Sequence, residues 1–115
     1  MEWEIIEDEK IKRDWLKWGN IVDDSVWDKI IERCDRVAEK LNLELTEFSD
    51  AKTSCWGFYR ERYYAYFKKN NDELRAVVLE IVADNKISEV IEIRVATEKY
   101  IEEQLKEELK ELQIA

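Results

Sequence analysis

The sequence predicts one α+β domain that consists of two N-terminal helices, a four-stranded antiparallel meander and a C-terminal helix. Apolar residues recur at helical spacing up to residue 41 and again after residue 97, which indicates helices at both ends of the chain. Between them the pattern changes to strand-like alternation, with runs of aromatic and β-branched side chains. The chain has 115 residues, no Pro and only two Gly, so we expect a single domain, residues 1–115, with short loops.

The first helix is predicted from about Glu7 to Gly19. Residues 2–5 alternate polar and apolar side chains, which fits a short strand, an extended arm or the first turn of this helix. From Glu7 onward the apolar side chains follow helical spacing, and Gly is a residue type that commonly closes a helix. The members of this stripe that we expect in the core are Ile11, Trp15 and Trp18.

The second helix shows the strongest periodic signal in the chain. Ser25 followed by Asp28 resembles a capping box at its start, and Asn42 can end the helix. A stripe of apolar residues spaced three and four apart runs between these ends and predicts the side that faces the core. Its members are Trp27, Ile30, Ile31, Cys34, Val37, Ala38 and Leu41.

Four strands and a last helix are predicted beyond Asn42. A high aromatic content identifies the central strand, and segments with Asn and Asp indicate turns. The predicted strands are 43–48, 55–69, 74–83 and 87–95, separated by turns at 49–54, 70–72 and 84–86. Thr97 is the expected cap of the C-terminal helix, whose apolar stripe is Ile101, Leu105, Leu109 and Leu112.

The last three strands can be aligned because their apolar faces must coincide. A one-residue slip turns every side chain to the other face, so three-residue loops at both turns keep the apolar sets together. A two-residue Asn-Asn turn would exchange the faces of the central strand and bury two Arg side chains. The preferred register pairs Tyr63 with Leu79, Ala65 with Val77, Arg62 with Glu80, Ala83 with Ile87, Leu79 with Ile91 and Val77 with Ile93.

The face of the central strand that points away from the core is the predicted binding surface. It carries large aromatic side chains and two Arg, and it is too apolar for a plain solvent-facing sheet. Three occupants fit this face: the C-terminal helix, a second copy of the chain in a symmetric homodimer, or a partner or ligand. The residues of the surface are Trp56, Phe58, Arg60, Arg62, Tyr64 and Tyr66.

The charge distribution favours a protein partner. A net charge of −9 disfavours duplex DNA and anionic membranes, because clustered cations supply the affinity for both. Acidic charge instead speeds encounter with a basic protein, so a basic partner is predicted together with a homodimer, and neither nucleic acid nor membrane. The only basic segment is 51–71, where five Lys or Arg and one Glu give +4. The acidic helix face expected to meet a basic partner is Asp28, Glu32, Asp35 and Glu39.

Catalysis is not expected from this composition. The chain has no His, which removes the commonest general base and metal ligand, and it has no phosphate-binding loop or nucleophile elbow. Asp23, Asp24 and Asp28 could hold a hard cation only weakly, so no metal and no cofactor is predicted. Cys34 and Cys55 are expected to be buried thiols, with a disulfide as the alternative.

The location is predicted to be cytoplasmic. No apolar run approaches the length of a membrane span, and no signal-peptide pattern follows the N-terminus. A charged content of 41% with both signs interspersed is favoured at high temperature and predicts a thermophilic source.

Two alternatives to a protein-binding module remain open. Aromatic residues interleaved with Arg also suit base stacking and phosphate contact with a single-stranded nucleic acid, or the binding of a small ligand. A purely structural homodimer would use the same sheet face.

In style the chain is similar to small acidic orphan proteins of archaeal viruses and plasmids, some of which are anti-CRISPR proteins. The likeness lies in its length, its acidity and the aromatic segment 56–59 within a meander. The resemblance implies an inhibitor of a basic, nucleic-acid-handling complex in the host cytoplasm, and it assigns no residue roles. The helix–meander–helix order is also similar to frataxin-like domains, although the Gly- and Pro-containing strand motifs expected of that family are missing.

Overall fold

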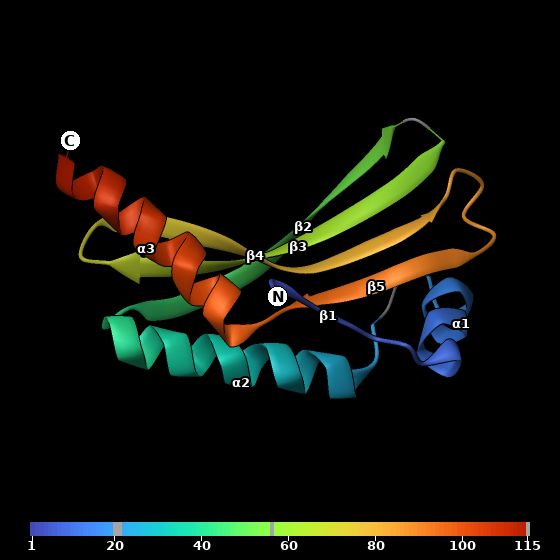
Figure 1. Ribbon diagram of the computed structural model, residues 1–115, viewed down its shortest axis with the longest axis horizontal. Coiled ribbons are helices and arrows are strands. Elements are labelled where there is room, and N and C mark those ends of the chain that lie inside the picture. Colours follow the sequence, from blue (N-terminus) through green and yellow to red (C-terminus); the bar gives the residue numbers. More distant parts are fainter. Residues whose placement is uncertain (20–21, 56, 115) are drawn as a thin grey trace.

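The computed structural model describes residues 1–19, 22–55 and 57–114 and confirms an α+β fold (Figure 1). Three helices accompany one antiparallel sheet with the strand order β1-β5-β4-β3-β2. The prediction of four strands is wrong, because the described chain forms five. The elements are β1 (Trp3–Ile5), α1 (Glu9–Lys17), α2 (Asp24–Leu41), β2 (Glu44–Cys55), β3 (Phe58–Lys69), β4 (Asp72–Asp84), β5 (Val90–Ala96) and α3 (Glu98–Ile114).

The additional strand, β1, extends the sheet beyond β5 and connects it to α2. Trp3 lies opposite Ala96 in an antiparallel pair. The carboxylate of Glu4 accepts a hydrogen bond from Lys29 Nζ at 2.6 Å and another from Arg33. These two bonds hold the pKa of Glu4 below its usual value. A strand of three residues is too short for periodicity to distinguish it from an arm or a helical turn, which is why the sequence left the choice open.

The helix starts are set by side-chain caps. Asp23 rather than Ser25 caps α2, since its carboxylate accepts the Ser25 N–H at 2.9 Å and the Ser25 hydroxyl at 2.6 Å. The capping box expected at Ser25 and Asp28 is therefore wrong by two residues. The cap expected at Thr97 is confirmed, because its hydroxyl accepts the Tyr100 N–H at 3.2 Å at the start of α3.

The first hairpin is longer than the sequence suggested. Residues 49–54, expected as a turn, continue β2 and pair with β3, with Ser49 opposite Tyr64 and Thr53 opposite Arg60. The polar composition of this segment reflects its position in the outermost strand, where small polar side chains face water on both sides. A run of polar residues was read as a turn, although Thr and Ser are compatible with an exposed edge strand.

The β3–β4 hairpin has the shorter of the two turns considered, together with a bulge in β4 that preserves the predicted faces. Its turn is the two-residue Asn70–Asn71, since Lys69 lies opposite Asp72. Tyr63 lies opposite Leu79 as predicted. Between these points β4 contains one extra residue in a β-bulge, so Ala65 pairs with Ala76 and not with Val77. The bulge compensates for the short turn, and the faces of β3 therefore remain as predicted.

The β4–β5 register differs from the prediction by more than one residue. The loop is residues 85–89, because the Asp84 carboxylate accepts the N–H groups of Ser88 at 2.7 Å and Glu89 at 2.8 Å. A hydrogen bond from the Ser88 hydroxyl at 2.7 Å and, second, the bond from the Glu89 N–H lower the pKa of Asp84. The pairs predicted for β4 and β5 are all wrong, and the observed pairs are Leu79–Val95, Ile81–Ile93 and Ala83–Val90. Ile87 and Ile91, expected in the core, are 39% and 46% exposed.

The main core lies on one side of the sheet, against α1 and α2 (Figure 1). Trp15 is fully buried there as predicted, whereas Trp18 follows the end of α1 and is 59% exposed, so its core assignment is wrong. Ile31 of the predicted α2 stripe is also 40% exposed. The largest side chains in the core include Trp15, Ile30, Phe67, Leu74, Leu79, Ile81, Ile93, Ile101 and Leu105.

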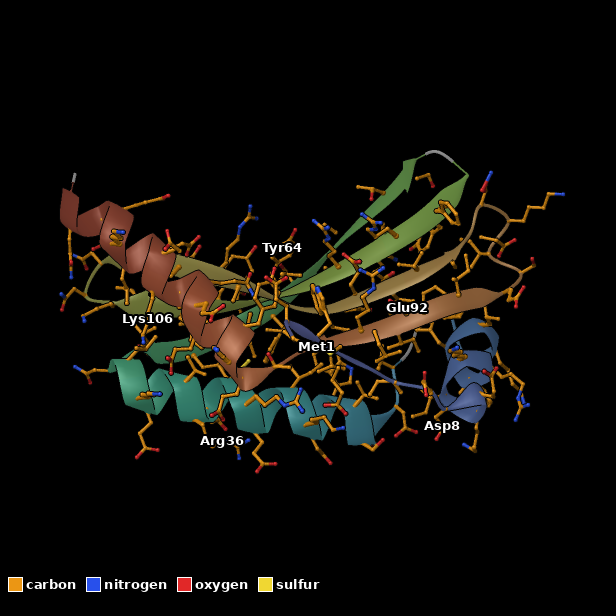
Figure 2. All side chains as sticks on the ribbon, viewed as in Figure 1. Met1, Asp8, Arg36, Tyr64, Glu92 and Lys106 are labelled. Atoms are coloured by element: carbon orange, nitrogen blue, oxygen red, sulfur yellow. The ribbon has the colours of Figure 1, made fainter. Side chains whose placement is uncertain are left out.

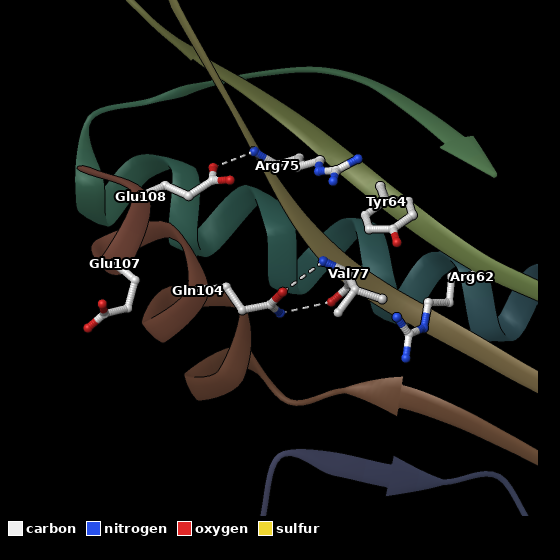
Figure 3. A pocket seen from close by; sticks show the side chains of 7 residues that line it. All are labelled: Arg62, Tyr64, Arg75, Val77, Gln104, Glu107 and Glu108. Atoms are coloured by element: carbon white, nitrogen blue, oxygen red, sulfur yellow. Dashed lines mark hydrogen bonds between the residues drawn. The ribbon is translucent and has the colours of Figure 1, made fainter. Parts of the chain in front are cut away.

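Helix α3 lies beside the first half of β4, past the end of β5 (Figures 1 and 3). The Gln104 side-chain amide accepts the Val77 N–H at 2.9 Å and donates to the Val77 carbonyl at 3.0 Å. Glu108 accepts the Arg75 N–H at 2.8 Å. These side chains satisfy backbone groups on the side of β4 that faces away from β3, in the part of the strand that β5 does not reach. The helix thus closes a sheet edge, and the hypothesis that it covers the aromatic face is wrong. Within the described ranges, no helix is both long and apolar enough to cross a membrane.

Candidate binding surface

The predicted surface residues of β3 share one face of the sheet. The alternation of side chains along β3 places Phe58, Arg60, Arg62, Tyr64 and Tyr66 on the face opposite the buried Tyr59, Glu61, Ala65 and Phe67; Figure 2 labels Tyr64. Phe58 is 50% exposed, and Tyr64 and Tyr66 are half-buried. Trp56 lies outside the described residues. We call this surface the arginine face; it consists of Phe58, Arg60, Arg62, Tyr64 and Tyr66 of β3, Glu80 of β4, and Glu92 and Arg94 of β5.

Glu80 is the centre of the arginine face. Its side chain is only 2% exposed, and its Oε2 accepts a hydrogen bond from Arg62 Nε at 2.6 Å. Its Oε1 lies 3.2 Å from an Arg94 guanidinium nitrogen and 3.8 Å from Arg60 Nε. The hydrogen bond to Glu80 raises the pKa of Arg62. One buried carboxylate therefore lies within 4 Å of three guanidinium groups on one face of the sheet.

The strand register produces this convergence. Arg62, Glu80 and Arg94 lie opposite one another on β3, β4 and β5, so their side chains emerge side by side on one face. The Arg62–Glu80 pair was predicted and is confirmed. Arg94 was not recognised as part of the surface, although its position on the polar side of β5 is a signal that the sequence contains. Arg94 also forms an ion pair with Glu92. The arginine face therefore contains three Arg side chains and two carboxylates.

A groove of about 360 Å³ borders the arginine face where α3 approaches β4 (Figure 3). The Arg75 guanidinium stacks over the Tyr64 ring at 4.8 Å from its centroid, a cation–π contact at the rim of the groove. Gln104 and Glu108 line the same groove but are engaged with the β4 backbone. The complete lining is Arg62, Tyr64, Arg75, Val77, Gln104, Glu107 and Glu108.

The predicted acidic helix face forms one exposed stripe on α2. The helical spacing of its four members brings their carboxylates to the side of α2 opposite the core. Only Glu32 has an intramolecular partner among the described residues, with Arg36 at 2.5 Å. Asp28, Asp35 and Glu39 make no ion pair within that part of the chain. Because α2 packs under the sheet, this acidic stripe and the arginine face lie on opposite sides of the molecule (Figure 1).

Glu61 is a second buried carboxylate, on the core side of β3. It is fully buried and accepts a hydrogen bond from the Tyr59 hydroxyl at 2.9 Å. Lys52 Nζ lies 3.8 Å away and supplies an opposite charge. Burial and, second, the bond to Glu61 raise the pKa of Tyr59. These contacts offset part of the cost of burying the Glu61 carboxylate, whose Oε1 has no hydrogen-bond partner among the described residues.

Cys34 is a free thiol in the core. Burial raises its pKa to about 12, which keeps it protonated and unreactive at neutral pH. Asp23, weighed as a weak cation ligand, acts instead as the α2 cap. Across residues 1–19, 22–55 and 57–114, no group of three Cys, Asp or Glu side chains is arranged to share a metal ion.

Comparisons with models of protein families, with curated proteins and with solved structures find no match to this chain. Its function is therefore inferred from the surfaces themselves.

Proposed function

We propose that the protein is a non-catalytic protein-binding module, an inhibitor, adaptor or small regulator, and that it contacts its partner through the arginine face. The observation that carries this proposal is a sheet face that none of the described helices covers, with a half-exposed Phe58 at one end, two half-buried Tyr, and three Arg within 4 Å of Glu80. Tyr and Arg are enriched among the residues that dominate binding energies at protein interfaces. Strands hold such side chains in place at a low entropic cost on binding.

The overall charge favours a partner that is basic. The net charge of −9 and the unpaired carboxylates of α2 attract a basic protein over several ångströms and speed its encounter. The arginine face itself is nearly neutral, because Glu80 and Glu92 offset most of its positive charge. We therefore assign encounter to the acidic surface and shape-specific contact to the arginine face.

The same charge balance disfavours a single-stranded nucleic acid on this face. Affinity for such a ligand needs unpaired cations along its phosphates as well as aromatic rings for stacking. Here the guanidinium of Arg62 is held by Glu80, and that of Arg94 is shared between Glu80 and Glu92. A phosphate would have to compete with these fixed carboxylates.

Site-specific photo-crosslinking in the cells that make the protein tests this proposal. A benzophenone amino acid is placed at Tyr64, on the arginine face, and at Trp18, an exposed aromatic residue just after the end of α1 that serves as the matched control. We expect a discrete covalent adduct with another protein from position 64 and none from position 18. Adding Phe58→Glu should remove the adduct from position 64, since it places a charge within an apolar contact.

Two results would contradict the proposal. Equal adducts from both positions would show that the arginine face has no special role. Saturable binding of a single-stranded oligonucleotide at physiological salt, lost when Arg60 and Arg62 are both changed to Gln, would favour the nucleic-acid alternative instead.

A further inference from the structure

The outer side of β2 is the longest open sheet edge among the described residues. β1 pairs with β5 over Arg94–Ala96, and Gln104 and Glu108 bind the backbone of the part of β4 that β5 does not reach. Nothing in the described ranges pairs with the outer side of β2, which has 12 residues and pairs regularly with β3 from Glu47 to Cys55. Open edges of this length are usually protected, since their free N–H and C=O groups can pair with another strand.

Helix α2 separates its charges between two flanks. Lys29 and Arg33 bind Glu4 of β1. On the same flank, Arg36 binds Glu98 and Lys40 binds Glu102, both of α3. All the basic residues within α2 are therefore used on the side of the helix that faces β1 and α3.

The other flank of α2 faces β2 and adjoins the acidic stripe on the solvent side of the helix. Trp27 packs edge-on against Phe48 of β2, with ring centroids 5.5 Å apart. Ile31 follows Trp27 by four residues and lies on this flank, and Asp28 and Asp35 of the acidic stripe adjoin it toward the solvent. Ile31 is 40% exposed, and neither Asp has an ion-pair partner among the described residues. The first part of the bare strand edge, as far as Phe48, thus lies beside α2, where the exposed Ile31 adjoins the acidic stripe, and β2 then diverges from the helix (Figure 1).

We infer that a basic, extended segment of the partner protein adds to β2 as a sixth strand. The backbone of the segment would pair with the free edge, and every second side chain would point to the helix side of the sheet. Lys or Arg at those positions would meet Asp28 and Asp35, and an aliphatic side chain would cover Ile31. This inference rests on the proposed function, because it names how part of the same partner docks.

The probe is a peptide as long as β2 in which lysine and threonine alternate, and its control replaces every lysine by glutamate. Amide hydrogen exchange of β2, followed by NMR on the full-length protein, reports strand addition directly. We expect the lysine peptide to slow exchange of the outward-pointing β2 amides by about tenfold or more, and the glutamate peptide to leave them unchanged.

Charge-reversal variants distinguish peptide binding at this site from non-specific attraction of a basic peptide to an acidic protein. Asp28→Lys with Asp35→Lys is compared with Glu103→Lys and Glu111→Lys, two exposed positions on α3 that change the net charge equally. The first pair should weaken peptide binding by about tenfold or more, and the second by less than about twofold, because distant exposed charges are screened.

Three outcomes would overturn the inference: no β2 protection by the lysine peptide, equal weakening by both pairs of changes, or β2 protection without peptide that grows with protein concentration. The last would identify a second copy as the added strand. None of the changed residues belongs to the arginine face. The crosslinking result at position 64 therefore tests the proposed function independently of the peptide-binding results.

Discussion

Replacing Glu80 with Gln is expected to lower the free energy of unfolding by about 2–4 kcal/mol. Glu80 is buried and lies within 4 Å of three guanidinium groups, so the neutral amide would leave like charges clustered without their counterion. We expect a loss of stability in the lower part of the range known for broken buried ion pairs, because the Arg60 and Arg62 side chains are each 44% exposed and water screens their charges. Chemical denaturation of the two proteins measures the difference.

Glu92→Gln is the matched control for this prediction. Glu92 lies on the same face and pairs with Arg94, but its side chain is 34% exposed. Its loss should cost less than about 1 kcal/mol. Equal costs for the two changes would mean that Glu80 does not organise the arginine face, and the rigid platform on which the proposed function depends would be lost.

Trp15→Ala should reduce the free energy of unfolding by about 3–5 kcal/mol, whereas Trp18→Ala should change it by less than about 0.5 kcal/mol. Both residues lie near the end of α1, yet Trp15 is fully buried against Tyr59, with ring centroids 6.2 Å apart, and Trp18 is largely exposed. Removing the buried ring leaves a cavity that the strands cannot fill. Thermal or denaturant unfolding of both variants tests the pair, and similar costs would contradict the observed position of Trp18.

The face assignment of β3 was predictable because strand side chains alternate with a period of two. Once burying Arg60 and Arg62 was judged too costly, Tyr59, Tyr63, Ala65 and Phe67 had to face the core, and they do. The Val77–Leu79 bulge was not predictable. An extra residue within a strand of β-branched side chains does not change the sequence pattern in a recognisable way. The prediction therefore placed the extra residue in a three-residue loop, whereas it lies in β4 as a bulge.

Elements that depend on contacts with distant parts of the chain could not be predicted either, because such contacts leave no periodic pattern in the sequence. β1 is too short to carry a pattern, and the polar end of β2 resembles a turn unless the neighbouring β3 is known. The convergence of Arg94 on Glu80 depends on the β4–β5 register, which is shifted by a loop that Asp84 stabilises. The sequence therefore identified which residues share a face, but not which of them meet.

Molar mass in solution, measured by light scattering, tests most directly whether the arginine face is free to bind another protein. The wild type and a Tyr64→Glu/Tyr66→Glu variant should both have the monomer mass of 13.9 kDa, and circular dichroism should show both folded. A net charge of −9 per chain opposes self-association, and neither Tyr side chain is fully buried. A wild-type dimer that the double change splits would contradict this account, because the arginine face would then be a self-interface as in the homodimer prediction. A variant that fails to fold would show that the face is part of the core.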